Sequence, residues 1–298
     1  MVRVKVPATI ANLGPGFDTL GVAVSLFNII EMNFSDELKI EVLNEGKNIL
    51  PENEVNLVYQ SAKKVIDRFG FERKLHIRLI NNIPLARGLG SSAAAIVGGV
   101  VAVNELLGKP LSMDEIINIA TNIEGHPDNV VPALLGGFTV SLFDGEKVFY
   151  KKFSLPEKEL CFVVAVPQFH LKTSDARKVL PEKISLKDAV YNMSRTALFV
   201  ACVAQKDFSF LDVLCRDKLH QPYRSSLIPG MEEIINRGME KGLLSVFLSG
   251  AGPSIAGICD KKDAEKAGKF MVGTFNNFGI KAKYLILNPC NEGVSVCT

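Results

Sequence analysis

The segment Pro84–Ala95, which reads PLARGLGSSAAA, carries the residue types best suited to bind an anion. Gly88 and Gly90 can adopt the positive φ angles that let a backbone approach a ligand closely. We expect a helix to begin at Ser91 or Ser92, and the first amides of a helix have no partner within it. Those amides and the helix dipole favour a bound phosphate, and a serine hydroxyl there can bind Mg²⁺. The segment therefore predicts a phosphate-binding loop.

Two other interpretations of this loop remain open at this point. An ordinary connection from a strand to a helix, with a serine cap, has the same composition. Residues Gly88–Ala93 also fit G-x-G-x-x-[GA], the turn of nicotinamide-dinucleotide sites. Against this, Asn81–Pro84 separate the strand from the glycines, and Glu105 is the only candidate for the acid expected about 20 residues on. The P-loop pattern is excluded, because no lysine follows Gly90.

The periodicity of apolar residues predicts the elements that hold this loop. The loop follows a strand at Leu75–Ile80 and precedes a helix that ends near Leu107, before Gly108 and Pro110. The other elements expected in this half are strands at Val2–Val6, Ile29–Phe34 and Leu38–Leu43 (the last two paired), helices at Asn56–Phe69 and from Ser112 to Ile123, and a hairpin of Gly136–Phe143 with Lys147–Phe153. Ser112 and Glu115 form the capping-box pattern.

A polar stretch, Ser154–Glu159, predicts a boundary between two domains, residues 1–155 and 156–298. The elements expected after it are helices at Leu186–Ala204, Phe208–Leu219, Gly230–Lys241 and Lys262–Phe278, and strands at Cys161–Val166, Leu244–Leu248, Ile255–Cys259 and Lys281–Leu287. Strands and helices are interspersed without strict alternation. The pattern therefore favours an α+β pair of domains over a doubly wound sheet.

Composition excludes several classes of protein. The 298 residues include 34 Lys and Arg against 32 Asp and Glu, a net charge of +2 that favours neither nucleic acid nor an anionic membrane. The longest apolar run, Ala93–Val103, is far shorter than the ~20 residues of a membrane-spanning helix. Six cysteines lack metal-site spacing, and Met1–Ile10 does not resemble a secretion signal. We expect reduced thiols and a cytoplasmic location.

Three segments together resemble the signatures of one family. Pro7–Gly21 (PATIANLGPGFDTLG), Pro84–Ala94 (PLARGLGSSAA) and Leu248–Ser254 (LSGAGPS) are similar, in order and spacing, to the three motifs of the GHMP kinases. The resemblance implies ATP and Mg²⁺, an N-terminal α+β domain with the phosphate loop, a C-terminal domain of ferredoxin-like plan, and a site between them. It also implies that the turn at Ser249–Ser254 braces the phosphate loop.

Within that family, three more segments resemble the kinases of homoserine. They are Glu124–Gly137, Leu171–Pro181 and His220–Gly230. The likeness implies transfer of phosphate from ATP to the hydroxyl of L-homoserine, giving O-phospho-L-homoserine for threonine biosynthesis. Guanidinium groups bind a carboxylate in a bidentate fork, and a carboxylate and an amide oxygen suit an ammonium. The substrate-binding residues that we expect are Asn12, Asp18, Asp128, Thr173, Arg177 and Arg224.

The resemblance also implies where the nucleotide and the metal bind. Ser92 and Glu124 match the metal positions, and Asp128 is expected beside the attacking hydroxyl, either as a base or as a group that only orients it. The nucleotide-binding residues that we expect are Pro84, Leu85, Ala86, Arg87, Gly88, Leu89, Gly90, Ser91, Ser92, Ala93, Ala94 and Asn56. As an isolated residue, Asn56 reads equally well as a helix cap.

Three alternatives to this function stay open on the sequence alone. The chain could phosphorylate another small molecule of the GHMP type, or use Gly88–Ala93 in a nicotinamide-dependent oxidoreductase. It could also be a binding module that contacts RNA, although the near-neutral charge argues against this. A homodimer is expected only by analogy with the family.

Overall fold

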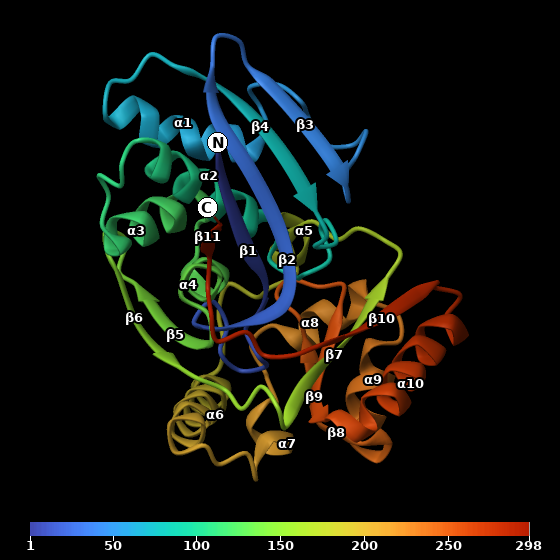
Figure 1. Cartoon of the computed structure of the whole chain (residues 1–298). Coiled ribbons are helices and arrows are strands. Elements are labelled where there is room, and N and C mark those ends of the chain that lie inside the picture. Colours follow the sequence, from blue (N-terminus) through green and yellow to red (C-terminus); the bar gives the residue numbers. More distant parts are fainter. Residues whose placement is uncertain (298) are drawn as a thin grey trace.

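The first sheet joins the two ends of the chain. The computed structural model describes residues 1–297 and contains two sheets (Figure 1). In the first sheet the strand order is β11-β1-β2-β4-β3, and β5 joins β6 to β2. These strands are β1 (Val2–Ala11), β2 (Leu20–Ser35), β3 (Lys39–Asn44), β4 (Lys74–Asn81), β5 (Phe138–Phe143), β6 (Val148–Phe153) and β11 (Ser295–Cys297).

Four helices pack against this sheet: α1 (Leu57–Arg68), α2 (Ser91–Leu106), α3 (Met113–Glu124) and α4 (Pro127–Leu135). The central helix, α2, is largely buried and approaches β2 closely. A Cβ at Gly98 would lie 2.4 Å from Ile30 Cδ1, so only glycine permits this approach. The packing holds the N-terminus of α2 in a fixed position.

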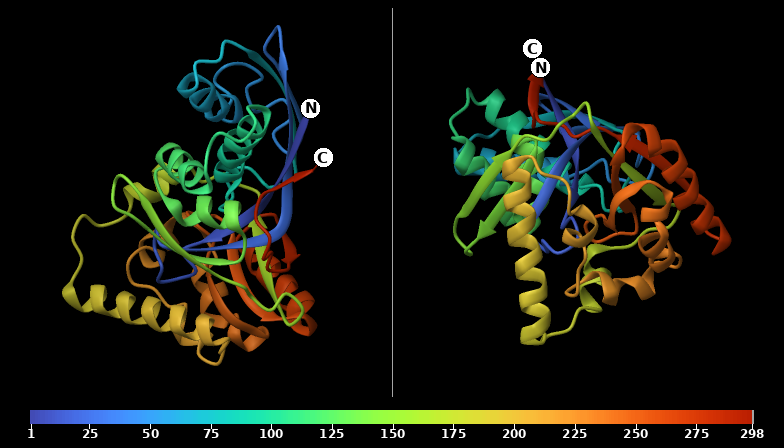
Figure 2. Two further views of the ribbon diagram at one scale, coloured as in Figure 1. Left: turned by 60° about the vertical axis from the view of Figure 1, so that its left-hand side comes forward. Right: turned by 90° about the horizontal axis from the view of Figure 1, so that it is seen from below.

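The second sheet has the expected ferredoxin-like plan. Its four strands are β7 (Leu160–Pro167), β8 (Leu243–Leu248), β9 (Ile255–Asp260) and β10 (Ala282–Leu287), antiparallel throughout and in the order β10-β7-β9-β8. Its helices are α5 (Thr173–Lys178), α6 (Leu186–Gln205), α7 (Leu211–Leu214), α8 (Gln221–Arg224), α9 (Met231–Arg237) and α10 (Ala264–Asn277), with 3-10 turns at Ser225–Leu227, Met239–Lys241 and Lys261–Asp263. Figure 2 shows α6 at the outer edge of the molecule.

Some predicted elements differ from the observed ones. Ile29–Phe34 and Leu38–Leu43 do not pair with each other, because β4 lies between them. The helix predicted at Phe208–Leu219 is helical only over Leu211–Leu214. Four short elements, α4, α5, α8 and β11, were not predicted. The polar stretch Ser154–Glu159 joins the two sheets, but β11 returns to the first one, so the domain division at residue 155 stays a prediction.

The cysteines whose side chains are described do not crosslink the fold. Cys161, Cys202, Cys215, Cys259 and Cys290 are free thiols, as expected, and the prediction for the Cys297 side chain lies outside the described part. Thr298 lies outside it as well. Among residues 1–297, no helix combines the length and the apolar character needed to cross a bilayer.

Candidate active site

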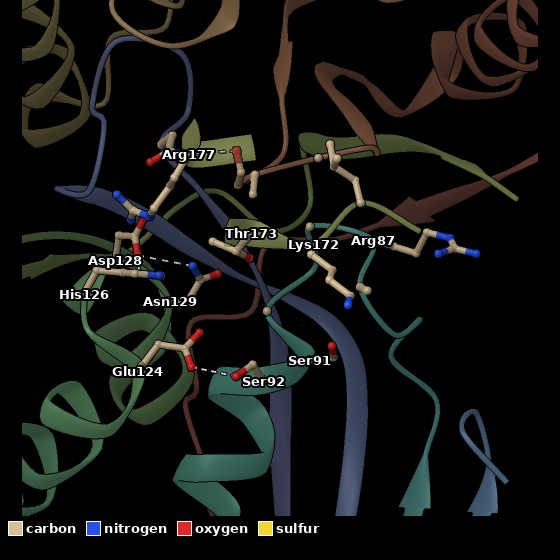
Figure 3. Close-up of a pocket in the computed structure, with 18 of the residues that line it drawn as sticks. Arg87, Ser91, Ser92, Glu124, His126, Asp128, Asn129, Lys172, Thr173 and Arg177 are labelled. Atoms are coloured by element: carbon tan, nitrogen blue, oxygen red, sulfur yellow. Dashed lines mark hydrogen bonds and ion pairs between the residues drawn. The ribbon is translucent and has the colours of Figure 1, made fainter. Parts of the chain in front are cut away.

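A cavity of about 230 Å³ lies where the two halves of the chain meet. It is bounded by the phosphate loop, the junction of α3 and α4, helix α5, and the turn after β8 (Figure 3). Its lining includes most of the predicted residues: Asn12, Asp18, Ala86, Arg87, Gly88, Gly90, Ser91, Ser92, Glu124, Asp128, Thr173, Arg177 and Arg224. Segments far apart in the sequence therefore form a single site.

The phosphate loop presents an uncapped helix N-terminus to this cavity. Gly90 precedes α2 with φ of 68° and offers no side-chain cap, whereas Asn56 caps α1 and Ser112 caps α3. The interpretation of the loop as a serine-capped connection is therefore wrong. The Ala94 amide donates to Gly90 O, which leaves the amides before it available to a ligand.

The turn after β8 braces the phosphate loop, as expected. Ser249 Oγ donates to Gly88 O at 2.5 Å. A Cβ at Gly88 would lie 2.1 Å from Ser249 O, so the two backbones are in direct contact. Asn12 Nδ2 donates to Gly250 O at 3.0 Å, which ties the turn after β1 to the same point. Three glycine-rich segments thus hold one another at the cavity wall.

Ser92 and Glu124 form a pair at the start of α2. Ser92 Oγ donates to Glu124 Oε2 at 2.7 Å, which places a hydroxyl and a carboxylate side by side (Figure 3). Burial raises the pKa of Glu124, and the hydrogen bond from Ser92 opposes that shift. Two hard oxygen donors next to a phosphate-binding loop fit Mg²⁺, which usually takes one or two protein ligands and completes its shell with phosphate and water.

Asp128 is buried at the start of α4 and is tied to His126. Its Oδ1 lies 2.5 Å from His126 Nδ1 and accepts from Asn129 Nδ2 at 3.2 Å. Burial alone would lower the pKa of His126, but the hydrogen bond and the charges of Asp128, Glu124 and Asp18 raise it to about 9. His126 is therefore protonated at neutral pH, and it donates a hydrogen bond to Asp128.

Asp18 and Arg177 form an ion pair in the wall of the cavity. The guanidinium donates to both carboxylate oxygens, at 2.7 and 2.9 Å. The backbone of Asp18 also donates to Asn12 Oδ1 at 3.0 Å, so Asn12 does bond its own turn. Ligand atoms of Asp18, His126 and Asp128 lie within 4.8 Å of one another, so two carboxylates and an imidazolium meet at this corner.

Arg224 is the largest fully buried side chain of the described residues, and it lacks an ionic partner there. Its nitrogens donate to Ala176 O at 3.1 Å, to Gly250 O at 3.2 Å and to His220 Nδ1 at 3.2 Å, and no ion pair within 4.0 Å includes it. Burial, and then the charge of Arg177, lower its pKa to about 10. The Phe17 ring lies under both guanidinium groups, 5.3 Å from Arg177 and 5.2 Å from Arg224.

Several predicted nucleotide residues do not line this cavity. Leu89, Ala93 and Ala94 are buried in the core, because the loop turns their side chains inward while its amides face the cavity. Asn56 and Leu85 line a second cavity of about 320 Å³, which shares Ala86, Ser91 and Ser92 with the first. Pro84 lies beside a third. Asn56 is also the cap of α1, through a 3.0 Å bond from the Val58 amide.

Other lining residues were missed or left open by the sequence. Phe17, His126, Asn129 and Lys172 also line the cavity. Figure 3 shows the Lys172 amine directed toward Ser91, whereas Arg87 points away from the carboxylates. The signal for Lys172 was its position beside Thr173 in a segment already singled out. Asn129 accepts from Thr9 Oγ1 at 2.7 Å, a contact across 120 residues.

The topology excludes the dinucleotide-binding interpretation of Gly88–Ala93. Such a turn belongs to a β-α-β unit with two parallel strands. Here β3 and β4 are the parallel pair of the described sheets, and they precede α2 rather than flanking it. The loop is a helix-terminal anion site in a mixed sheet.

Comparison with known proteins defines the class first. The family model for the GHMP kinases N-terminal domain matches residues 56–137, and the one for the GHMP kinases C-terminal region matches residues 201–277. The fold is shared with a mevalonate kinase structure at a TM-score of 0.70 and 18% identity, over 98% of this chain and 100% of that one. The fold and the matched domains are those of a GHMP kinase.

Relatives that match nearly the whole chain identify the family within this class. A homoserine kinase of Carboxydothermus hydrogenoformans is 46% identical over 98% of this chain and 96% of its own, and one of Moorella thermoacetica is 46% identical over 99% and 100%. The crystal structure of homoserine kinase from Cytophaga hutchinsonii matches with a TM-score of 0.89 and 31% identity, over 99% of this chain and 97% of that one. The chain belongs to the homoserine kinase family.

Proposed function

We propose that this chain transfers the γ-phosphoryl group of ATP to the hydroxyl of L-homoserine, giving O-phospho-L-homoserine for threonine biosynthesis. The observation that carries the proposal is the buried guanidinium of Arg224, which has no ionic partner, in a cavity that also holds Arg177 and three carboxylates. A buried charge without a partner costs folding free energy, so its retention favours an anionic ligand. A neutral sugar offers no such group, whereas an amino acid does.

The substrate has three polar groups, and the cavity has a counterpart for each. Arg224 and Arg177 bind the carboxylate. Asp18 and Asn12 Oδ1 accept from the ammonium, at the corner where Asp18 lies close to Asp128. Thr173, at the start of α5, lines the space between them. The hydroxyl then lies beside Asp128 and faces the phosphate loop.

The nucleotide occupies the other side of the cavity. The free amides of α2 bind the phosphate oxygens, and Lys172, with its amine directed toward Ser91, adds a positive charge there. The adenosine extends into the second cavity, whose lining adds Leu50, Val55 and Asn56. Ala86, Ser91 and Ser92 line both cavities, so one ligand can extend from the first cavity into the second.

Ser92 and Glu124 hold the Mg²⁺ that accompanies ATP. When bound, the ion supplies positive charge to the phosphate oxygens during transfer. The protein contributes to the transfer mainly by positioning the two substrates. The substrate oxygen forms a bond to the γ-phosphorus while the bond from that phosphorus to the bridging oxygen of ADP breaks, and the hydroxyl proton passes to solvent water.

Asp128 orients the hydroxyl rather than removing its proton. Its Oδ1 already accepts from protonated His126 and from Asn129, and these bonds hold the carboxylate in place to accept a hydrogen bond from the substrate hydroxyl. Asp128→Asn keeps an acceptor oxygen of the same size. We expect it to retain substantial turnover with a raised KM for homoserine; a loss of kcat beyond about 10³-fold would instead identify a base.

The decisive assay measures ADP release in the presence of homoserine, mevalonate, galactose or shikimate. We expect release with homoserine and background with the others. A chain that binds ATP but releases ADP only with a different acceptor would be another GHMP small-molecule kinase. The cytoplasmic location stays a prediction.

A further inference from the structure

His220 is buried directly before α8, and each nitrogen of its ring has a hydrogen-bond partner. Arg224 follows four residues later, and its amide donates to His220 O, so one helical turn brings the two side chains together. Nδ1 of His220 lies 3.2 Å from Arg224 Nη1. Nε2 lies 2.7 Å from Gly14 O, in the turn that also carries Asn12 and Asp18. The imidazole therefore connects the buried guanidinium to the turn on the acidic side of the site.

These two partners are compatible with only one protonation state of the His220 ring. Gly14 O can only accept, so Nε2 carries a hydrogen and donates it. Arg224 Nη1 can only donate, so Nδ1 carries no hydrogen and accepts. A doubly protonated ring would direct an N–H at the guanidinium, and the opposite tautomer would set two acceptors, Nε2 and Gly14 O, against each other. The ring is therefore a neutral imidazole with its hydrogen on Nε2.

The surroundings of the ring favour the same neutral form. Burial lowers the pKa of His220, while the charge of Asp217 opposes this shift and the charge of Arg224 adds to it. Asp217 Oδ2 lies 3.6 Å from Nε2, which is too far for a hydrogen bond. The Asp217 carboxylate instead accepts from Asn192 Nδ2 and from three backbone amides around the start of α8. It is supplied with donors without the hydrogen of the His220 ring.

A neutral acceptor holds the Arg224 guanidinium without cancelling its charge. Nε donates to Ala176 O at 3.1 Å. Nη1 donates to Gly250 O and to His220 Nδ1, both at 3.2 Å. These bonds use the hydrogen of Nε and both hydrogens of Nη1. Among residues 1–297, no hydrogen bond involves Nη2, so its two hydrogens remain for a ligand in the cavity that Arg224 lines. A carboxylate in place of His220 would instead form an internal ion pair.

We propose that His220 is a positioning residue of the substrate site: as a neutral acceptor, it fixes the rotation of the Arg224 guanidinium so that Nη2 is directed at the carboxylate of the amino-acid substrate. The inference rests on the proposed function, since that function supplies the carboxylate. The Phe17 ring adds to the fixation, because it stacks on the His220 ring at 5.2 Å between centroids and lies 5.2 Å from the Arg224 guanidinium. An arginine held in advance loses less side-chain freedom on binding, which lowers KM.

Two substitutions separate the roles of the two ring nitrogens. The amide oxygen of His220→Asn can replace Nδ1 and accept from Arg224, whereas the amide nitrogen of His220→Gln can replace Nε2 and donate to Gly14 O. Both variants lose the ring and its stacking on Phe17, so each is the control for the other. We expect His220→Gln to raise the KM for homoserine about tenfold or more, with little change in kcat or in the KM for ATP. His220→Asn should rescue the KM for homoserine to within about threefold of the wild type.

The outcomes of these kinetics distinguish the role of His220 from the proposed function. His76→Gln is a further control, because the His76 ring bonds Glu41 on the neighbouring strand at 2.9 Å and does not line the cavity; it should leave the KM for homoserine unchanged. Equal KM values for His220→Asn and His220→Gln would overturn the proposal, because a packing role does not depend on which nitrogen is replaced. A wild-type chain that releases no ADP with homoserine would refute the proposed function, and the role of His220 with it.

A second experiment requires neither turnover nor a folded variant. Nitrogen-15 NMR of the labelled wild-type chain at neutral pH, without ligands, shows which ring nitrogen of His220 carries a hydrogen. The signals of His220 are identified through their contacts with the Phe17 ring. We expect a hydrogen on Nε2 and none on Nδ1. A ring protonated on both nitrogens, or on Nδ1 alone, would overturn the proposal, because Arg224 would then find no acceptor in His220.

Discussion

Arg224 offers a test that separates stability from function. Replacing it with methionine removes a buried guanidinium without an ionic partner and leaves an apolar chain of similar length. If Arg224 is retained for a ligand and not for the fold, Arg224→Met should leave the stability of the ligand-free protein nearly unchanged and weaken homoserine binding. A residue retained for the fold would give the opposite pattern.

The size of the expected stability change follows from the surroundings of the Arg224 side chain. A pKa lowered from 12.5 to about 10 corresponds to roughly 3 kcal/mol against the charged form. The bonds that Arg224 donates to Ala176 O, Gly250 O and His220 Nδ1 offset this by about 1 kcal/mol each. The two contributions nearly cancel, so the stability should change by less than about 1 kcal/mol, or roughly 2–4 °C in Tm. Loss of a charge-assisted contact to the substrate carboxylate should raise KM about 10²–10³-fold.

Two measurements decide the outcome: Tm by calorimetry without ligands, and the KM for homoserine in the ADP-release assay. Arg237→Met is the control, because Arg237 makes a surface pair with Glu233 at 2.7 Å; neither quantity should change much. A Tm several degrees lower, together with an unchanged KM, would refute the reasoning.

The remaining predictions concern the helix N-terminus and its charges. Because its pKa is raised from 6.5 to about 9, His126 contributes stability that is complete below pH 6.5 and is lost as the pH rises through about 9, roughly 3 kcal/mol in all; unfolding curves of His126→Gln should lack this dependence. Gly90→Ala should lower the free energy of unfolding by more than about 2 kcal/mol, because its Cβ would lie 1.9 Å from Thr9 Oγ1. Gly108 also has a positive φ but faces open space, so Gly108→Ala should cost only about 1 kcal/mol by denaturant titration. Lys172→Ala should lower kcat about tenfold or more, while the KM for homoserine changes little; an unchanged kcat would remove Lys172 from the phosphate site.

Local signals in the sequence account for what could be predicted. Gly88 and Gly90 mark the phosphate loop because left-handed backbone and close contact with other segments both require glycine. Ser112 and Glu115 predicted the start of α3 because a capping box acts within four residues. These features depend on neighbours in the chain, so a single sequence reveals them.

Features that depend on distant contacts could not be read in the same way. The position of β4 between β2 and β3 is set by which faces of the strands meet the core, and all three strands alternate similarly. Helix α4 was missed because Pro127 and Pro132 obscure its pattern, although Pro127 lies at its first position, where a missing amide costs nothing. The ion pair of Asp18 with Arg177 joins residues 159 apart, and nothing local predicts that they are partners.

That ion pair has a consequence for substrate recognition. The side chains of Arg177 and Asp18 are 37% and 34% exposed, so separating them costs only about 1 kcal/mol. Homoserine can therefore replace the internal pair with two new ones, its carboxylate on Arg177 and its ammonium on Asp18. The exchange succeeds only for a ligand with both charges, because a ligand with one leaves the other residue without a partner.

Two analogues separate these contributions. 4-Hydroxybutanoate lacks the ammonium, and 3-amino-1-propanol lacks the carboxylate, while both keep the hydroxyl. We expect each to have a kcat/KM at least about a hundredfold below that of homoserine, and the double variant Asp18→Asn/Arg177→Gln to lose less than the sum of the single losses, since each single variant strands one charge. Lys178→Gln, which breaks only the exposed pair with Asp175, is the control and should leave all three substrates unaffected. Additive losses, or an analogue used as well as homoserine, would mean that the two charges are recognised independently and that the internal pair plays no part in selection.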